Sequence, residues 1–174
     1  CDSLNGSNAD MNPSNDTLYA YYTILDSIQP KQALVEEFTQ ASCGACLIYA
    51  PKDDHILKTY STLGYCNSFR YHVNWPGIDY MNNETQTLFV GNRVNFYNMS
   101  SVPSEMVDGI NQTNGVNTFQ ILIDDSIGSP FKINITSCTY DPASRIYSLQ
   151  AKITSYAYIP ENTYARVVLS VDTM

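Results

Sequence analysis

Two cysteines separated by two residues, in the segment SCGACLIYAP, constrain the fold of this chain more than any other feature. A short apolar run at residues 33–38, ALVEEF, precedes them and predicts a buried strand. The apolar residues after Cys46 are spaced for a helix that extends to about Tyr60, with Pro51 inside it as an expected kink. The sequence therefore predicts that the CGAC segment lies where a strand passes into a helix.

That position favours redox chemistry at the cysteine pair. The free amides and the positive dipole end at a helix N-terminus stabilise a thiolate, so Cys43 is the expected nucleophile. Cys46, one turn further into the helix, is the expected resolving cysteine. A purely structural disulfide rarely closes so short a loop, because it removes little entropy from the unfolded chain. Zinc binding is the weaker alternative, since His55 and His72 are not spaced as ligands, and we expect neither a metal nor another cofactor.

The composition is that of an exported protein with a packed core. The 174 residues include 44% apolar residues, enough for one domain of ordinary size and part of a second. Only 15% of the residues are charged, well below the usual share of about a quarter. The net charge of −8 and the nine scattered Lys and Arg residues argue against nucleic-acid binding. No run of 18 apolar residues is present, so the sequence predicts no membrane-spanning helix.

The cysteines outside the CGAC segment lead to two further expectations. The sequence begins with Cys1, and a mature N-terminal cysteine is what signal peptidase leaves on a bacterial lipoprotein. We expect lipid on Cys1, although a boundary that falls on cysteine by chance gives the same sequence. Residues 1–16 are polar and rich in Gly, Ser and Asn, as expected of a flexible tether. Cys66 and Cys138 are expected to form a disulfide or to stay as two buried thiols.

The rest of the chain divides at about residue 130. Residues 17–129 are the expected main domain, with an arm or strand at 17–31, a strand at 69–73, a helix at 84–96, a strand and Asp-Gly turn at 102–109, and a helix at 117–127. Residues 130–174 alternate apolar and polar side chains around the turn signals DPAS and IPEN, which predicts three antiparallel strands. These strands suggest the edge of a β-sandwich, either as a truncated or minimal second domain or packed against the first.

The segment ALVEEFTQASCGACLIYAP resembles the active-site region of thioredoxin. It has an apolar strand, an acid six residues before the first cysteine, and a helix proline five residues after the second. The later segment VPSEMVDG is similar to the cis-proline strand of that fold. The resemblance covers residues 33 to about 127 and implies a thioredoxin-like α/β fold, in which helices flank a mixed sheet. The chain differs from thioredoxin at Ser42, where tryptophan is usual, and at Ala45, where proline is usual.

The resemblance also implies roles for individual residues. Glu37 occupies the position of thioredoxin's buried acid, which implies a raised pKa and acceptance of a proton from Cys46 during exchange. The alternative is that the strand exposes Glu37 to water. The resemblance further implies a cis bond between Val102 and Pro103, close to Cys43, where the backbone binds an incoming substrate peptide as a short strand.

Two more segments, FRYHVNWPGIDYMNN and GNRVNFYNMSSVP, resemble a thioredoxin-like family that is common among exported and outer-membrane proteins of Bacteroidota. In YHVNWPG, Tyr71 is expected in the core, while His72 and Trp75 either pack there or face a substrate beside the cysteines.

Short motifs also predict glycosylation. They are N-x-S/T at Asn5, Asn15, Asn83, Asn98, Asn111 and Asn134, and D-S/T before an apolar residue at Ser3, Thr17, Ser27, Ser126 and Thr173.

Two functions are compatible with these features. The first is a lipid-anchored cell-envelope protein, on the periplasmic or surface face of the bacterial outer membrane, that exchanges thiols and disulfides with exported proteins. The second is a non-catalytic accessory lipoprotein that uses the same fold to bind a partner in an outer-membrane assembly.

Overall fold

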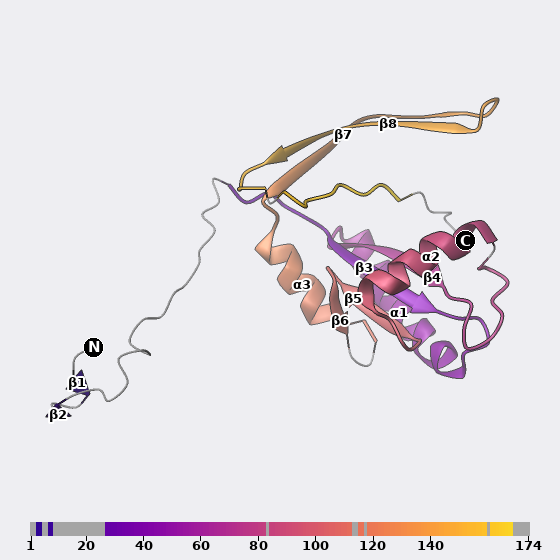
Figure 1. Cartoon of the computed structure of the whole chain (residues 1–174), viewed down its shortest axis with the longest axis horizontal. Coiled ribbons are helices and arrows are strands. Elements are labelled where there is room, and N and C mark those ends of the chain that lie inside the picture. The colour runs from indigo at the N-terminus through magenta and orange to yellow at the C-terminus, as the bar shows by residue number, and fades with distance from the viewer. Residues whose placement is uncertain are drawn as a thin grey trace.

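A four-stranded mixed sheet forms the centre of the main domain (Figure 1). The computed structural model describes residues 3–4, 7–8, 27–82, 84–112, 115–116, 118–159 and 161–168. The sheet has the order β4-β3-β5-β6. β3 (Ala33–Thr39) pairs in parallel with β4 (Cys66–His72), and it pairs antiparallel with β5 (Ser104–Val107), which in turn pairs antiparallel with β6 (Ile110–Gln112). This order confirms the predicted thioredoxin-like sheet.

In the part of the chain that the structure describes, three helices flank this sheet. α1 (Gly44–Thr62) joins the two parallel strands, α2 (Glu84–Tyr97) precedes the antiparallel pair, and α3 (Thr118–Ile127) follows it. The ends of α2 and α3 agree with the prediction to within one residue, whereas α1 starts two residues earlier because Cys43 caps it. Pro51 lies inside α1, as predicted.

The side chains of β3 alternate between two core clusters, one on each face of the sheet. Ala33 and Val35 pack against α1 and α3, in a cluster that also contains Leu57 and Ile121. Phe38 packs on the other face, in a cluster with Val73, Val90 and Met106. Because both faces are covered, β3 reads as a nearly continuous apolar run in the sequence.

The C-terminal region forms a long hairpin that projects from the main domain (Figure 1). Its strands, β7 (Phe131–Asp141) and β8 (Ile146–Ser155), pair with each other as a separate two-stranded antiparallel sheet. The predicted third strand is wrong for the part that the structure describes, since residues 161–168 form no strand. Nothing among the described residues therefore completes a β-sandwich.

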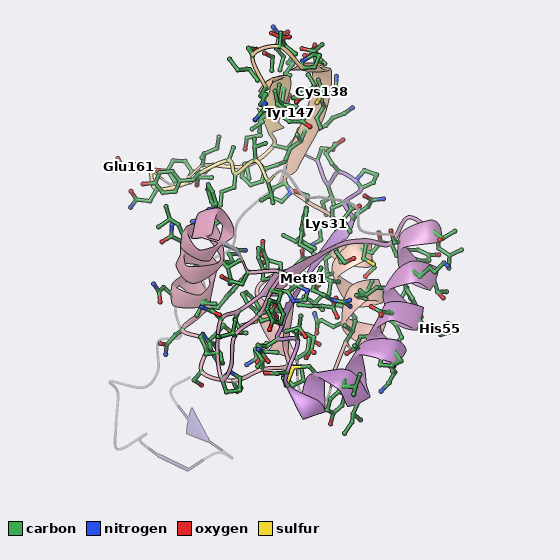
Figure 2. The ribbon with its side chains drawn as sticks, turned by 90° about the vertical axis from the view of Figure 1, so that its right-hand side faces the viewer. Lys31, His55, Met81, Cys138, Tyr147 and Glu161 are labelled. Carbon is green, nitrogen blue, oxygen red and sulfur yellow. A yellow bond between two sulfur atoms is a disulfide. The ribbon has the colours of Figure 1, made fainter. Side chains whose placement is uncertain are left out.

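Of the two alternatives for Cys66 and Cys138, the disulfide is wrong, and the alternative of buried thiols is confirmed for Cys66 and wrong for Cys138. Both are free thiols, and only Cys66 is buried. Figure 2 places Cys138 and Tyr147 on the hairpin, far from His55 on α1. Cys66 lies at the start of β4, in the core of the main domain. The two sulfurs therefore belong to separate parts of the fold.

The N-terminal expectations lie mostly outside the described residues. Within 1–16, two short strands pair, β1 (Ser3–Leu4) with β2 (Ser7–Asn8), and Cys1 is not described. Within 17–31, the described part starts at residue 27, and Gln29 bridges Ser129 at the base of the hairpin. Of the helices described, none has the length and apolar character needed to cross a membrane.

Candidate functional site

Cys43 and Cys46 form a disulfide at the N-terminus of α1. Their Cα atoms are 5.2 Å apart. Cys43 is the N-cap residue, with extended backbone angles, and its Sγ accepts a hydrogen bond of 3.1 Å from the backbone N–H of Cys46. Cys43 is partly exposed whereas Cys46 is buried. In the reduced protein, the helix N-terminus would stabilise negative charge at the more accessible sulfur.

The start of β5 approaches this disulfide from the other half of the domain. The peptide bond between Val102 and Pro103 is cis, and the Val102 carbonyl oxygen lies 3.6 Å from the Sγ of Cys43. Both parts of the sequence prediction for these residues are therefore confirmed. The role of their backbone in binding a substrate peptide stays a prediction.

Beneath the disulfide, the face of the sheet that α1 covers carries buried carboxyl groups. Glu37 on β3 lies directly opposite Glu105 on β5, and the two side chains are 6% and 4% exposed. Both line one small pocket together with Cys46, Asp53 and Pro103. The predicted burial of Glu37 is confirmed, and the alternative of a solvated carboxylate is wrong.

Burial raises the pKa of each of these acids. For Glu37, burial outweighs the lowering effect of the Arg70 guanidinium, so the predicted raised pKa is confirmed. For Glu105, burial and then repulsion by Asp53 and Glu37 raise the pKa to about 7. Burial also raises the pKa of Asp53, although this carboxylate accepts a hydrogen bond of 3.0 Å from the backbone N–H of Val116. The pocket can therefore hold and release a proton near neutral pH.

Arg70 on β4 supplies positive charge to this group. Its guanidinium donates hydrogen bonds of 2.8 and 3.1 Å to Oε2 of Glu37, and it also pairs with Asp54 on α1. A single guanidinium thus pairs with a buried carboxylate in the pocket and with an exposed carboxylate on α1. This contact holds Glu37 in position without cancelling the effect of its burial.

A second network holds the loop that precedes Cys43. Asp79 is buried and accepts hydrogen bonds of 2.7 Å from the backbone N–H of Ala41 and 2.8 Å from that of Met81. His72 places its Nδ1 2.9 Å from the same carboxylate. Burial alone would raise the pKa of Asp79, but the hydrogen bonds from His72 and the two amides outweigh it and lower the pKa.

Gln40 extends this network to the residue beside the first cysteine. Its side-chain oxygen accepts hydrogen bonds from the backbone N–H and the hydroxyl of Ser42, at 2.7 and 2.8 Å, and its amide nitrogen donates to the carbonyl of Ile78. A Cβ on Gly77 would lie 2.7 Å from the Ser42 hydroxyl oxygen, so a larger residue there would have to displace this hydrogen-bonded hydroxyl. The WPGID loop therefore shapes the approach to Cys43.

The sequence prediction did not include Asp79 and Gln40, and it left the role of His72 open. The available signal was the segment YHVNWPGID, whose acid and glycine are the residues that contact the loop before Cys43. Trp75, preceding a second cis-proline bond, is partly buried and packs against the Phe38 cluster with Tyr71. Of the two alternatives for Trp75, packing in the core agrees with the structure, and a role in facing a substrate stays a prediction.

Exposed apolar side chains occur in the segments that flank the disulfide and in the loop that contacts Gln40. Leu47 and Ile48 follow Cys46 in the first turn of α1 and are 77% and 76% exposed. Ile78 and Tyr80 are also exposed, in the loop that contacts Gln40. A surface of this kind suits contact with apolar or unfolded polypeptide. Among the described residues, no group of three or more His, Cys, Asp or Glu side chains is arranged to hold a metal ion.

The chain matches no protein-family model and no curated protein sequence. Among solved structures, it is similar to the crystal structure of a protein from Agrobacterium tumefaciens, with 16% sequence identity and a TM-score of 0.45. The similarity covers 67% of this chain and 55% of that protein. A similarity of this size identifies neither the fold nor the function of the chain.

Proposed function

We propose that this protein exchanges thiols and disulfides with exported proteins through its CGAC segment. The observation that supports this most directly is the position of the Cys43–Cys46 pair. It caps a helix, faces the carbonyl of Val102 before a cis-proline, and lies above the buried carboxyl of Glu37. A nucleophile, a backbone acceptor for a peptide and a proton acceptor are thus present at one site.

The exchange proceeds in two steps. The Cys43 thiolate attacks one sulfur of a substrate disulfide, which forms a mixed disulfide and releases the other substrate sulfur as a thiolate. The Cys46 thiolate then attacks the Sγ of Cys43, forms the Cys43–Cys46 disulfide, and releases the second substrate sulfur. Two electrons pass from the dithiol to the substrate, and the reverse sequence oxidises a substrate dithiol.

Glu37 accepts the proton that Cys46 loses before the second step. Its carboxyl shares a pocket with Cys46, and burial raises its pKa towards the range in which proton transfer is useful. Arg70 keeps the side chain in place. Ser42 and Ala45, which replace the usual Trp and Pro of thioredoxin, would set a different reduction potential for the pair.

The same proposal includes the cellular location. Membership of the thioredoxin-like lipoproteins of Bacteroidota, supported by the YHVNWPGID segment, would place the chain at the outer membrane through lipid on Cys1. Exported proteins would be its substrates, on the periplasmic or surface face. Intact mass of the native protein decides the anchor, since an unmodified Cys1 would exclude it.

Reduction of a protein disulfide substrate such as insulin, with dithiothreitol as electron donor, tests the exchange activity. We expect activity in the unmodified protein and in Cys138→Ser, which removes the exposed hairpin thiol. We expect none in Cys43→Ser, and we expect Cys46→Ser to accumulate the mixed disulfide. Activity of the unmodified protein that is no higher than that of Cys43→Ser would refute the proposal.

The exposed apolar surface favours a second candidate function. Leu47, Ile48, Ile78 and Tyr80 would bind a partner without any thiol exchange, as expected of an accessory lipoprotein in an outer-membrane assembly. Co-purification of a partner that survives replacement of both Cys43 and Cys46 by serine would favour this function. Loss of the partner in that variant would favour exchange.

A further inference from the structure

The hairpin formed by β7 and β8 sorts its side chains by polarity onto two faces. Paired residues in a sheet share a face, and the register of the two strands is known. One face, here called the apolar face, carries Ile133, Ile135, Cys138, Tyr140, Tyr147, Leu149, Ala151 and Ile153. The opposite face carries Lys132, Asn134, Ser137, Thr139, Asp141, Ser148, Gln150, Lys152 and Thr154, together with the apolar Ile146, which pairs with Asp141 next to the turn.

A β-bulge keeps the apolar face continuous along β7. The register shifts between Ile135 and Ser137, so that one extra residue, Thr136, enters this strand. Without the bulge, with Thr136 paired as an ordinary strand residue, Cys138 and Tyr140 would point to the polar face, because a shift of one residue reverses every side chain. With it, Tyr140 stacks on Tyr147 across the strands, with 4.4 Å between ring centres.

This apolar face is uncovered in the described part of the chain. Its Ile, Leu and Tyr side chains are 38% to 65% exposed. The hairpin lies apart from the main domain in Figure 1, and in Figure 2 the labelled Cys138 and Tyr147 lie on the hairpin, away from that domain. A two-stranded hairpin is only marginally stable in water by itself, and a sheet with one apolar face is normally covered on that face.

We propose that the apolar face binds the same face of a second copy of this chain. The contact would be two-fold symmetric, so that two hairpins form a four-stranded sandwich with the sheets about 10 Å apart. The Ile133 and Ile153 end of one hairpin would pack against the Tyr140 and Tyr147 end of the other. Cys138 lies near the middle of β7, where the two-fold axis would bring both copies of it together.

The size and charge of the face support this occupant. Six large side chains, each exposing about 100 Å², provide about 600 Å² per copy and about 1,200 Å² in a dimer, the lower limit for a stable specific interface. Each chain has a net charge of −8, yet the apolar face itself has no charged residue. Both lysines of this hairpin, Lys132 and Lys152, lie on the other face, so the contact would bury no like charges.

Sedimentation equilibrium of the full chain at about 1 to about 100 μM tests the proposal, because the weakest specific interfaces of standard size have micromolar affinities. We expect the unmodified chain to dimerise. Ile135→Lys places a charge on the apolar face and should weaken the dimer at least about tenfold. Thr139→Lys, which places the same charge on the polar face of the same strand, should leave it unchanged.

Cross-linking of Cys138 tests the same contact without disturbing the face. Copper phenanthroline and oxygen accept the two electrons when two Cys138 thiols form a disulfide, so the unmodified chain should give a covalent dimer. With Cys1 changed to serine in every variant, so that its thiol cannot react, Cys138→Ser should not. The matched control moves the thiol to the polar face, Cys138→Ser with Thr139→Cys, and should cross-link far less.

Two results would overturn the proposal. One is a monomer up to about 100 μM, since a face of this size should associate by then. The other is equal cross-linking from positions 138 and 139, which would show that no particular face is buried. If Ile135→Lys fails to fold, the comparison of the two thiol positions decides, because neither variant changes the size of a large apolar side chain.

Discussion

Glu105 should make the protein less stable as the pH rises through neutrality. In the folded chain its pKa is raised from 4.5 to about 7 by burial and by the neighbouring acids. The group therefore keeps its proton in the folded state over a pH range in which the unfolded chain has released it. This contribution to stability is complete below the pKa that Glu105 has in the unfolded chain, and it is lost as the pH rises towards the pKa that Glu105 has in the folded chain. The shift corresponds to about 3 kcal/mol in the free energy of unfolding.

The variant Glu105→Gln isolates this contribution, since glutamine has nearly the same size and cannot ionise. Urea unfolding of the oxidised protein should be measured near pH 4.5 and near pH 8, on either side of the titration. At the lower pH the two proteins should differ little. At the higher pH, Glu105→Gln should be more stable by about 2–3 kcal/mol, because it avoids a buried charge beside Glu37 and Asp53.

The control is Glu161→Gln, which removes an exposed carboxylate. It should change the free energy of unfolding by less than about 0.5 kcal/mol at both pH values. A difference between the unmodified protein and Glu105→Gln that is the same at both pH values would refute the reasoning. It would show that Glu105 titrates normally, despite its position opposite Glu37 in the sheet.

Three other substitutions test the packing around the site. Arg93→Ala leaves the buried carboxylate of Glu36 without its guanidinium, so urea unfolding should show a loss of about 3–5 kcal/mol, and a loss below about 1 kcal/mol would contradict this. Asp79→Ala removes the hydrogen-bond acceptor for the backbone amide of Ala41, so hydrogen exchange at that amide should accelerate. The free energy of unfolding should fall by about 1–3 kcal/mol. Unchanged exchange at Ala41 would contradict this prediction. Leu57→Ala creates a cavity under α1 and should cost about 2–5 kcal/mol in thermal or urea unfolding, whereas a neutral effect would mean that this cluster is loosely packed.

Local signals made much of the main domain predictable. The apolar run before the cysteines, the helical spacing after them and the VP segment each involve a few neighbouring residues, and together they place Cys43 beside the cis-proline. The position of Glu105 beside Glu37 could not be predicted from such local signals. Its pairing with Glu37 depends on the register between β3 and β5, which joins residues nearly seventy positions apart.

The hairpin is a second case in which the local sequence pattern predicted the strands but not their tertiary surroundings. Alternating apolar and polar residues after Pro130 correctly predicted strands, because that period is a property of each strand alone. The pattern could not show that residues 161–168 would form no strand. It also could not show that Cys138 would be exposed far from Cys66, since pairing of cysteines depends on tertiary structure.

The adjacent acids Glu36 and Glu37 show why residue type alone could not define the site. Successive side chains of a strand point to opposite faces, so the two carboxyls enter different surroundings. Glu36 faces α2, where burial alone would raise its pKa, but hydrogen bonds from Arg93 and Tyr97 outweigh it and lower the pKa. Glu37 faces α1 among other acids, and there burial prevails and the pKa is raised. One carboxylate thus anchors a helix as a fixed charge, while its neighbour is left able to bind and release a proton beneath Cys46.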